Sequence, residues 1–162
     1  MCNIYFVRHG MSKWTKTEIV KGFKDLSLNK IGKEQAFKTA LRLKGLPKDT
    51  ILLTSALKRS FETAKIIGEV IKIEIKETIE DLNEQFLSTN FLETDENFKS
   101  RISSCLDKIL EKYKDECKDI IIVSHQRVFS ILTKYLLDKE TRKLDFCEVV
   151  RINLKEKKME FM

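Results

Sequence analysis

Both histidines of this chain stand at the ends of apolar segments that have the length of buried strands. The first segment, residues 2–7, leads into Arg8 and His9, and the second, residues 120–123, leads almost directly to His125. Ligands of open α/β sheets bind beyond the carboxyl ends of the strands, so two such histidines are expected to face one site. An imidazole there can act as a nucleophile, a proton carrier or a cationic donor.

The elements that must position these histidines alternate between strand and helix patterns. Strands are predicted at residues 2–7, 50–54, 71–75 (as a half-exposed edge) and 120–124, with a final pair near 146–154 and 158–162. Helices are predicted over 30–45 after the N-cap Asn29, after the N-cap Ser55, from Thr94 through about Tyr113, and over 126–138, whereas 8–28 and 77–93 are expected to be irregular. This alternation predicts a three-layer α/β/α sandwich with a mainly parallel central sheet and an antiparallel edge strand.

Length and charge narrow the function classes. The 162 residues, of which 42% are hydrophobic and 35% charged, are expected to form one domain, 1–162, with a substantial core. The net charge is +6, but Lys is interleaved with acidic residues and forms no basic block. This pattern argues against a nucleic-acid partner and favours a small anionic substrate. No apolar run is long enough to span a bilayer, so no membrane partner is expected.

The residue types that bind metal ions form no cluster in the sequence. With two His and no dense cluster of His, Asp, Glu and Cys, the sequence predicts neither a metal site nor a cofactor. The four cysteines, which are Cys2, Cys105, Cys117 and Cys147, have no metal-type spacing. The N-terminus lacks the basic region and cleavage site of a signal peptide. Reduced thiols and a cytoplasmic location are therefore expected.

A series of motifs, in order along most of the chain, resembles the histidine phosphatase superfamily, also called phosphoglycerate-mutase-like. The motifs are Arg8-His9-Gly10, Gly22–Leu28 followed by Gly32 and Gln35-Ala36, Ser55–Ala64, Leu82-Asn83-Glu84, Phe98–Arg101 and Val123-Ser124-His125. Arg-His-Gly alone would be a weak signal, but the ordered series is specific. The chain is similar to a compact, phosphatase-type member of that family.

The resemblance implies a metal-independent phosphomonoesterase that acts through a phosphohistidine. His9 is the implied nucleophile, Arg8, Arg59 and His125 the implied phosphate-binding set, and Glu84 the implied proton donor. These types suit the chemistry, because a guanidinium fork binds two phosphate oxygens and a buried carboxyl group can hold a proton near neutral pH. Any carboxylate between residues 77 and 96 could donate instead of Glu84. Further phosphate or substrate contacts are implied for Thr15, Lys21, Gly22 and Gln126, of which Thr15 stands where the family usually has Asn, and Gln126 where Gly is common.

Three alternatives remain beside a phosphatase of small metabolites. They are a phosphoglycerate-type mutase, a phosphatase of phosphohistidine proteins, and a non-catalytic phospho-ligand module, which would usually lose the nucleophile that is present here as His9. The connections at 77–93 and 114–119 are short, whereas mutases of this family typically carry larger insertions there. The sequence predicts neither the substrate nor the oligomeric state.

Overall fold

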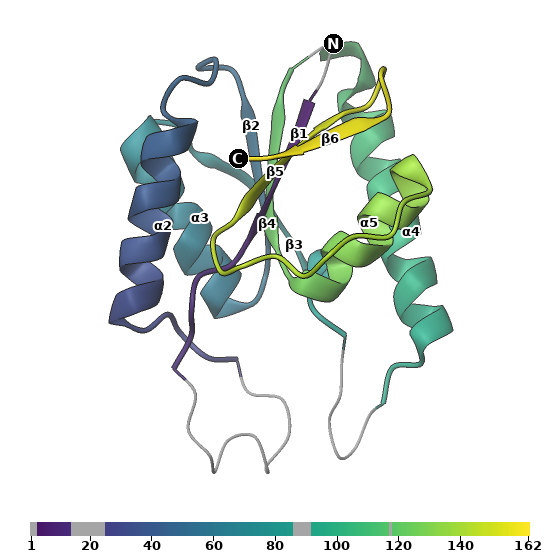
Figure 1. Cartoon of the computed structure of the whole chain (residues 1–162), viewed down its shortest axis with the longest axis horizontal. Helices are drawn as coiled ribbons and strands as arrows, with labels where there is room; N and C mark the ends of the chain where they lie inside the picture. Colours follow the sequence, from purple (N-terminus) through teal and green to yellow (C-terminus); the bar gives the residue numbers. More distant parts are fainter. Residues whose placement is uncertain (1–2, 14–24, 86–91, 117) are drawn as a thin grey trace.

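The fold is a sheet between two helical layers (Figure 1). The computed structural model describes residues 3–13, 25–85, 92–116 and 118–162. Its elements, in chain order, are β1 (Asn3–Arg8), α2 (Lys30–Leu43), β2 (Ile51–Ser55), α3 (Lys58–Ile71), β3 (Ile75–Ile79), the 3₁₀ turn η1 (Glu80–Leu82), α4 (Asp95–Tyr113), the 3₁₀ turn η2 (Lys114–Glu116), β4 (Ile120–Ser124), α5 (Gln126–Leu137), β5 (Val149–Asn153) and β6 (Lys158–Phe161). The predicted α/β/α sandwich is confirmed.

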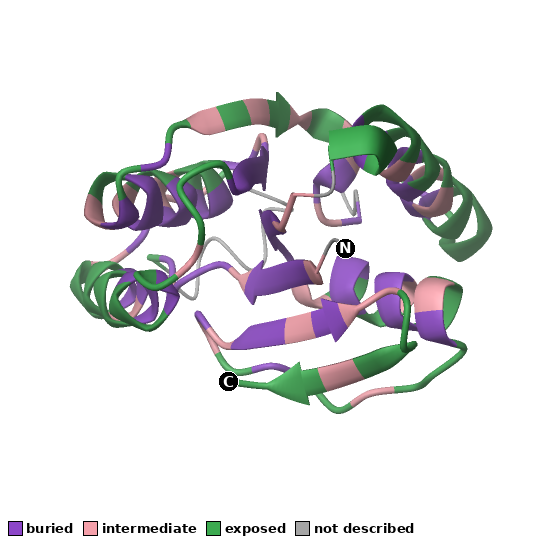
Figure 2. Cartoon of the chain, turned by 90° about the horizontal axis from the view of Figure 1, so that it is seen from above, coloured by how far each residue is buried: buried purple, intermediate pink, exposed green. Residues whose placement is uncertain are grey.

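The sheet is parallel at its centre and antiparallel on one side. Its strand order is β3-β2-β4-β1-β5-β6. The first four strands in that order are parallel, β5 pairs antiparallel with β1, and β6 pairs antiparallel with β5. Helices α2 and α3 cover one face and α4 and α5 the other, and the buried strands lie between the exposed outer sides of the helices (Figures 1 and 2).

The alternation of side chains along β1 divides the core into two halves. Ile4 and Phe6 belong to the cluster beneath α4 and α5, whereas Tyr5 and Val7 belong to the cluster beneath α2 and α3. Both sides of the strand are therefore buried, which explains why its sequence is continuously apolar rather than alternating. The same reasoning applies to β4, whose five residues are all buried.

Strand register brings the carboxyl ends of the parallel strands to one edge of the sheet. Arg8 pairs with Ser124, and Thr54, the residue before Ser55, pairs with Val123. Whatever follows these strands must therefore emerge side by side at this edge.

Two local predictions at the edge of the sheet are wrong. The edge strand is Ile75–Ile79 rather than 71–75, so the segment 77–93 also begins within a strand. Helix α3 continues through Ile71 because Ile67 and Ile71 complete its buried face, and the chain turns at Lys72, whose φ of 62° is left-handed. Gly68 allows this turn, since a Cβ there would lie 2.5 Å from the carbonyl oxygen of Ile73.

The predicted N-cap of α3 is also wrong. Ser55 is the buried last residue of β2, and the N-cap position is Leu57, which makes no side-chain capping bond. Instead, the Oδ1 atom of Asp25 accepts a hydrogen bond from the backbone N–H of Lys58 at 2.7 Å. A capping group from a distant segment thus replaces the local one, and the hydroxyl of Ser55 is left for another contact. By contrast, Asn29 and Thr94 cap α2 and α4 as predicted.

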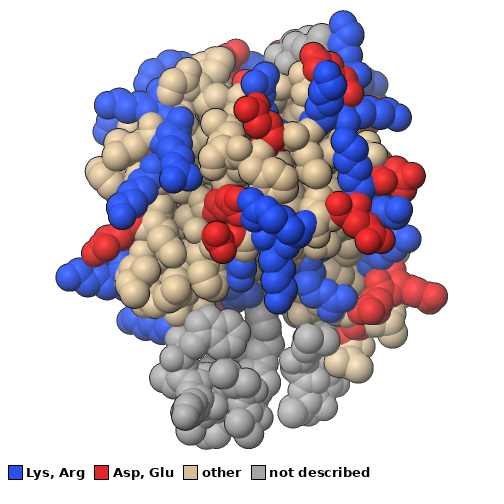
Figure 3. All heavy atoms as spheres, viewed as in Figure 1, with Lys and Arg blue, Asp and Glu red and all other residues tan. Residues whose placement is uncertain are grey.

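The surface in Figure 3 carries Lys and Arg interspersed with Asp and Glu rather than in one basic field. Among the helices that the structure describes, none is long and apolar enough to cross a membrane.

Candidate active site

His9 lies at the centre of the edge where the parallel strands end. It directly follows β1, is only 6% exposed, and its ring centroid lies 5.0 Å from that of His125. The sequence prediction that both histidines face one site is consistent with this geometry. Gly10 must be small here, because a Cβ at this position would lie 2.6 Å from the carbonyl oxygen of Gly32.

The hydrogen bonds of His9 define its tautomer. The guanidinium of arginine only donates, so Nε2 of His9 must accept the hydrogen bond from Nε of Arg59 at 3.3 Å. Nδ1 then carries the proton and donates it to the carbonyl oxygen of Gly10 at 2.8 Å. Burial lowers the pKa of His9 to about 3, and the positive charges of Arg59 and Arg8 act in the same direction. The ring is therefore neutral at pH 7, with the Nε2 lone pair available to attack an electrophile.

Two arginines flank this imidazole. Arg59, in the first turn of α3, is 6% exposed, and burial lowers its pKa, partly offset by the charges of Glu84 and Asp25. Arg8 stacks on the ring of Phe146 at 4.1 Å, and its Nη1 donates to the carbonyl oxygen of Leu144. Its Nε is buried without a hydrogen-bond partner in the described part of the chain. Guanidinium groups in this environment stay charged and are suited to an anion.

His125 presents a second unsatisfied nitrogen. It is fully buried, and its Nε2 lies 2.8 Å from the Oγ of Ser55 and 3.3 Å from that of Ser60. Its Nδ1 is buried and has no partner among the described residues. Burial, with His9 and Arg59, holds the pKa of His125 well below its usual value, so the ring is neutral. A buried polar atom without a partner is uncommon, and here it fits a ligand that is itself a hydrogen-bond acceptor or donor.

Glu84 follows η1 at the end of β3 and brings a carboxyl group to the same edge. Burial raises its pKa, opposed by the backbone N–H groups of Gln85 and Arg127 and then by the guanidinium of Arg59. Burial lowers the pKa of Arg8 and of Arg59, and the charge of this carboxyl group partly offsets that lowering, so it acts on both guanidinium groups. A carboxyl group with a raised pKa can hold a proton closer to neutral pH than an exposed one.

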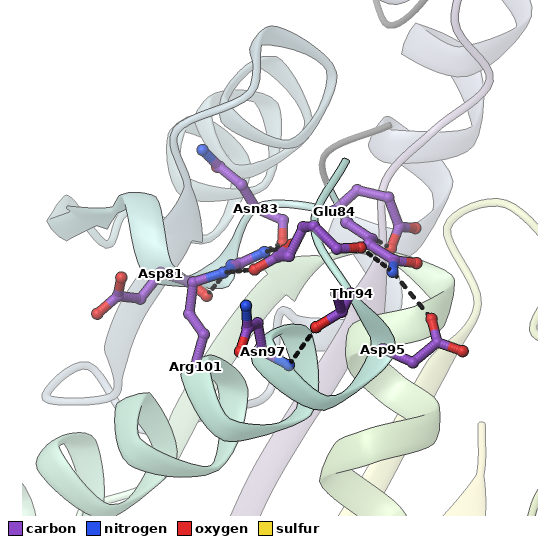
Figure 4. A network of polar contacts seen from close by, with 9 residues as sticks. Asp81, Asn83, Glu84, Thr94, Asp95, Asn97 and Arg101 are labelled. Carbon is purple, nitrogen blue, oxygen red and sulfur yellow. Dashed lines mark hydrogen bonds and ion pairs between the residues drawn. The ribbon is translucent and has the colours of Figure 1, made fainter. Parts of the chain in front are cut away.

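A polar network fixes the segment that carries Glu84 (Figure 4). Arg101 on α4 donates to the carbonyl oxygens of Asp81 at 2.6 Å and Asn83 at 3.1 Å, and it binds Glu93 through two bonds of 2.8 Å. The side chain of Asn83 accepts from the N–H of Ala56 at 2.9 Å. The backbone on the N-terminal side of Glu84 is thus tied both to α4 and to the end of β2.

Other supporting residues were missed by sequence reasoning. Thr63 accepts from the N–H of Gly10 at 3.0 Å and donates to the carbonyl oxygen of Arg59 at 2.6 Å, so it links the two parts of the site. Thr63 lies four residues after Arg59, on the same face of α3, and this spacing was the available signal. Arg101 ends the Phe98–Arg101 motif, but no role was predicted for it, and no local pattern pointed to Phe146.

The remaining predicted contacts are less informative. Thr15, Lys21 and Gly22 lie outside the described residues. The Oε1 of Gln126 accepts from the N–H of Leu144 at 2.7 Å, and its Nε2 donates to Ser130 at 3.4 Å, so its side chain bonds to protein atoms. The side chain of Arg127 pairs with Asp95 at 2.9 Å on the surface.

The site as a whole is suited to a compact anion. It combines one neutral nucleophilic imidazole, two guanidinium groups, a second imidazole with an unpartnered buried nitrogen, and a carboxyl group with a raised pKa. Within the described ranges, no group of three or more His, Cys, Asp or Glu side chains is arranged to hold a metal ion. The arrangement can transfer an anionic group to His9 while a proton moves at Glu84.

Comparison with known proteins gives a family match over nearly the entire chain. The model of the histidine phosphatase superfamily (branch 1) matches residues 4–89 and 84–162. Phosphoglycerate mutase-like protein 4 of Arabidopsis thaliana is 40% identical over 85 residues, which are 52% of this chain and 36% of that protein. The match thus spans about a third of the length of that relative.

Two further proteins match over more of the chain. A protein of Bacillus subtilis named uncharacterized phosphatase PhoE is 28% identical over 152 residues, covering 83% of this chain and 77% of that protein. The structure of a mycobacterial glucosyl-3-phosphoglycerate phosphatase superposes with a TM-score of 0.77 at 13% identity, covering 99% of this chain and 96% of that one. At that identity the superposition shows a shared fold.

Proposed function

Because this chain belongs to the histidine phosphatase superfamily, we propose that it is a metal-independent phosphomonoesterase that uses His9 as its nucleophile. The proposed substrate is a small phosphorylated metabolite, and the final acceptor is water. The observation that carries the proposal is the neutral His9, whose Nε2 accepts from Arg59 while its Nδ1 proton is held by Gly10. The phosphatase name of the Bacillus relative agrees with it.

The first step forms a bond between Nε2 of His9 and phosphorus. The lone pair of Nε2 attacks in line, and the bond from phosphorus to the leaving oxygen breaks. Nδ1 keeps its proton and donates a hydrogen bond to the carbonyl oxygen of Gly10. This bond stabilises the positive charge that develops on the ring. Arg8, Arg59 and His125 bind the phosphoryl oxygens in this proposal, so the negative charge of the transition state meets fixed donors.

Glu84 completes both steps in the proposal. It gives its proton to the leaving oxygen in the first step, and its carboxylate takes a proton from the attacking water in the second. The bond between phosphorus and Nε2 then breaks, and His9 returns to the neutral tautomer. The raised pKa of Glu84 favours the protonated form that the first step requires.

The pH profile of kcat/KM tests the role of Glu84. Donation requires protonated Glu84, so the rate is expected to fall as the pH rises through its raised pKa. Attack requires neutral His9, so a loss on the acidic side is expected only near the His9 pKa of about 3. Glu84→Gln should lose activity on alkyl phosphates by about 10²- to 10⁴-fold, as loss of a general acid does.

A leaving group that needs little protonation provides the matched comparison. With p-nitrophenyl phosphate, Glu84→Gln should lose much less in the first step, which can be followed as the pre-steady-state burst of nitrophenolate. Glu80→Gln is the control, because that exposed carboxylate lies outside the site. Equal losses in the first step for both leaving groups would assign the proton to another carboxylate between residues 77 and 96.

Water rather than a second hydroxyl is expected to accept the phosphoryl group. Only residues 80–94 lie between β3 and α4 in the sequence, and only residues 114–119 lie between α4 and β4. A closing lid is what protects a reactive intermediate from water in other enzymes, and large insertions at these positions are what the family's mutases carry. The assay supplies 3-phosphoglycerate with a trace of 2,3-bisphosphoglycerate, in EDTA, and follows free phosphate and 2-phosphoglycerate. Rapid isomer formation with little phosphate release would favour a mutase instead.

The substrate class is tested separately from the mechanism. A panel of phosphorylated sugars, glycerates and amino acids, with a phosphohistidine protein as a separate arm, identifies the substrate class. A clear preference for the phosphohistidine protein would replace the metabolite phosphatase by a protein phosphatase.

We also propose that the protein is located in the cytoplasm. Cys105 and Cys147 are buried free thiols, which supports a reducing compartment.

A further inference from the structure

Gln126 occupies the first position of α5, directly after His125, but its side chain turns to the segment before β5. Its Oε1 accepts a hydrogen bond from the backbone N–H of Leu144 at 2.7 Å. Its Nε2 donates a longer bond of 3.4 Å to the Oγ of Ser130, one turn further along the helix. The strong contact of this amide is thus made to a peptide group eighteen residues away in the sequence.

Leu144 also contacts Arg8, one of the two arginines of the candidate site. The carbonyl oxygen of Leu144 accepts from Nη1 of Arg8, and two residues later Phe146 stacks on the same guanidinium at 4.1 Å. One backbone residue therefore receives Gln126 at its N–H and Arg8 at its carbonyl oxygen. The segment Leu144–Phe146 fixes Arg8 from two directions.

The other hydrogen bonds of this segment run toward β5. Asp145 donates from its N–H to Oε2 of Glu148 at 2.8 Å and accepts from the N–H of Glu148 at 3.1 Å. The sheet ladder of β5 begins only at Val149. Cys147 is tied by its N–H to the carbonyl oxygen of Arg8 at 2.9 Å and by its own carbonyl oxygen to Thr39 at 2.6 Å, but these bonds lie beyond Phe146. The Leu144 side chain is buried in the core, and the N–H of its peptide group donates to Gln126.

We propose that Gln126 is a positioning residue for Arg8, acting through the Leu144 backbone, rather than a side chain that contacts the substrate. This inference rests on the proposed function, in which Arg8 binds the phosphoryl group. A long guanidinium side chain gains affinity for two oxygens of an anion only when its plane is fixed in advance. The amide that fixes it lies next to His125, so the start of α5 supports both an imidazole and a guanidinium of one site.

A double-mutant cycle on anion binding tests the inference. Gln126→Met keeps the length of the side chain but removes the acceptor, and it is combined with Arg8→Met. Binding of orthovanadate is measured by calorimetry, with thermal unfolding as the check of the fold. In the wild-type background Gln126→Met is expected to weaken vanadate binding by about five- to thirtyfold, the effect of one lost buried hydrogen bond. In the Arg8→Met background the same change is expected to cost less than about twofold.

The control variant changes the partner of the Nε2 atom of Gln126 and leaves its Oε1 atom bonded to Leu144. Ser130→Ala removes the partner of Nε2 and the hydrogen bond from the Ser130 hydroxyl to the carbonyl oxygen of Gln126 at 3.2 Å, but it leaves the bond from Leu144 to Oε1 in place. It is expected to leave vanadate affinity within about twofold of wild type. Equal losses from Gln126→Met with and without Arg8 would show that Gln126 acts on the anion independently, and no loss in either background would also overturn the inference. If the Met variant fails to fold, Gln126→Ala is used in the same cycle, since a small residue is tolerated in the first turn of a helix.

Anion binding is measured instead of turnover so that the two proposals can fail separately. A wild-type protein that binds vanadate but hydrolyses no phosphomonoester would contradict the proposed function and leave the cycle readable. A normal phosphatase whose cycle shows no coupling would keep the function and remove the role of Gln126. A wild-type protein that binds neither vanadate nor phosphate would overturn both.

Discussion

The His9→Ala variant is expected to keep the fold and to lose phosphomonoesterase activity to background. His125 is the other imidazole of the described site, but its Nε2 lies 2.8 Å from Ser55, and in the proposal its Nδ1 donates to a phosphoryl oxygen, so neither nitrogen offers a lone pair to phosphorus. His9 follows β1, and the ring contacts of His9 are with Arg59, His125 and Phe146, none of which belongs to the two core clusters. The measurement is the rate on the best substrate of the panel, together with the unfolding midpoint.

Trapping the intermediate makes this prediction specific to the chemistry. Brief incubation with ³²P-labelled substrate followed by an alkaline quench should leave acid-labile, base-stable label on wild-type His9 and none on His9→Ala. His125→Ala is the matched control, since it also removes an imidazole but should still acquire label, at a lower rate. Activity above a few percent of wild type in His9→Ala would rule out the covalent mechanism.

The parts of the fold that local chemistry decides could be predicted from the sequence. The apolar segments of β1 and β4 are continuous because both of their faces are buried, and that pattern is visible without a structure. Asn29 and Thr94 cap their helices with their own side chains, accepting from Gly32 and Asn97, so each signal lies within three residues.

The helix after Ser55 was predicted, but its N-cap, its end and the bounds of the next strand were not, because distant contacts decide them. The capping group of α3 comes from Asp25, thirty-three residues away. Isoleucines at 71, 73, 75 and 79 fit either a strand from 71 or one from 75, and the buried face of α3 decides between them. Nothing local indicates that Lys72 adopts a left-handed conformation.

The same division applies to the candidate site. His9 and His125 could be singled out because they follow strands that end at one edge, and Arg59 because it lies in the Ser55–Ala64 motif of the family resemblance. The structure brings the three side chains together. The supporting residues are ordinary polar side chains until tertiary packing buries them. Arg101, for example, lies on a helix rich in exposed charges, and only the fold shows that it holds the carbonyl oxygens before Glu84.

Arg59→Lys is expected to be nearly as damaging as Arg59→Ala. The guanidinium lies almost completely buried, with its Nε 3.3 Å from Nε2 of His9, which is the attacking nitrogen in the proposal, so in that proposal it stays beside the phosphoryl group during transfer. A Lys ammonium is a single point charge and cannot bond two phosphate oxygens in the planar geometry of the guanidinium. Loss of such a transition-state contact costs about 2–4 kcal/mol, which corresponds to tens- to several-hundred-fold in kcat/KM.

The comparison between the two variants carries the test, because each removes the fork and only one removes the charge. If charge alone mattered, Lys would recover most of the loss seen with Ala, and near-normal rates in Arg59→Lys would place this side chain outside the phosphate-binding shell. Lys65→Ala, on the exposed side of the same helix, controls for the general loss of a cation and should leave the rate unchanged. Vanadate, which adopts the five-coordinate geometry of phosphorus during transfer, should inhibit the wild type and lose affinity in both Arg59 variants by similar factors. Similar factors are expected because the donors of a guanidinium are fixed relative to one another, whereas a lone ammonium leaves one oxygen of the buried anion without its partner.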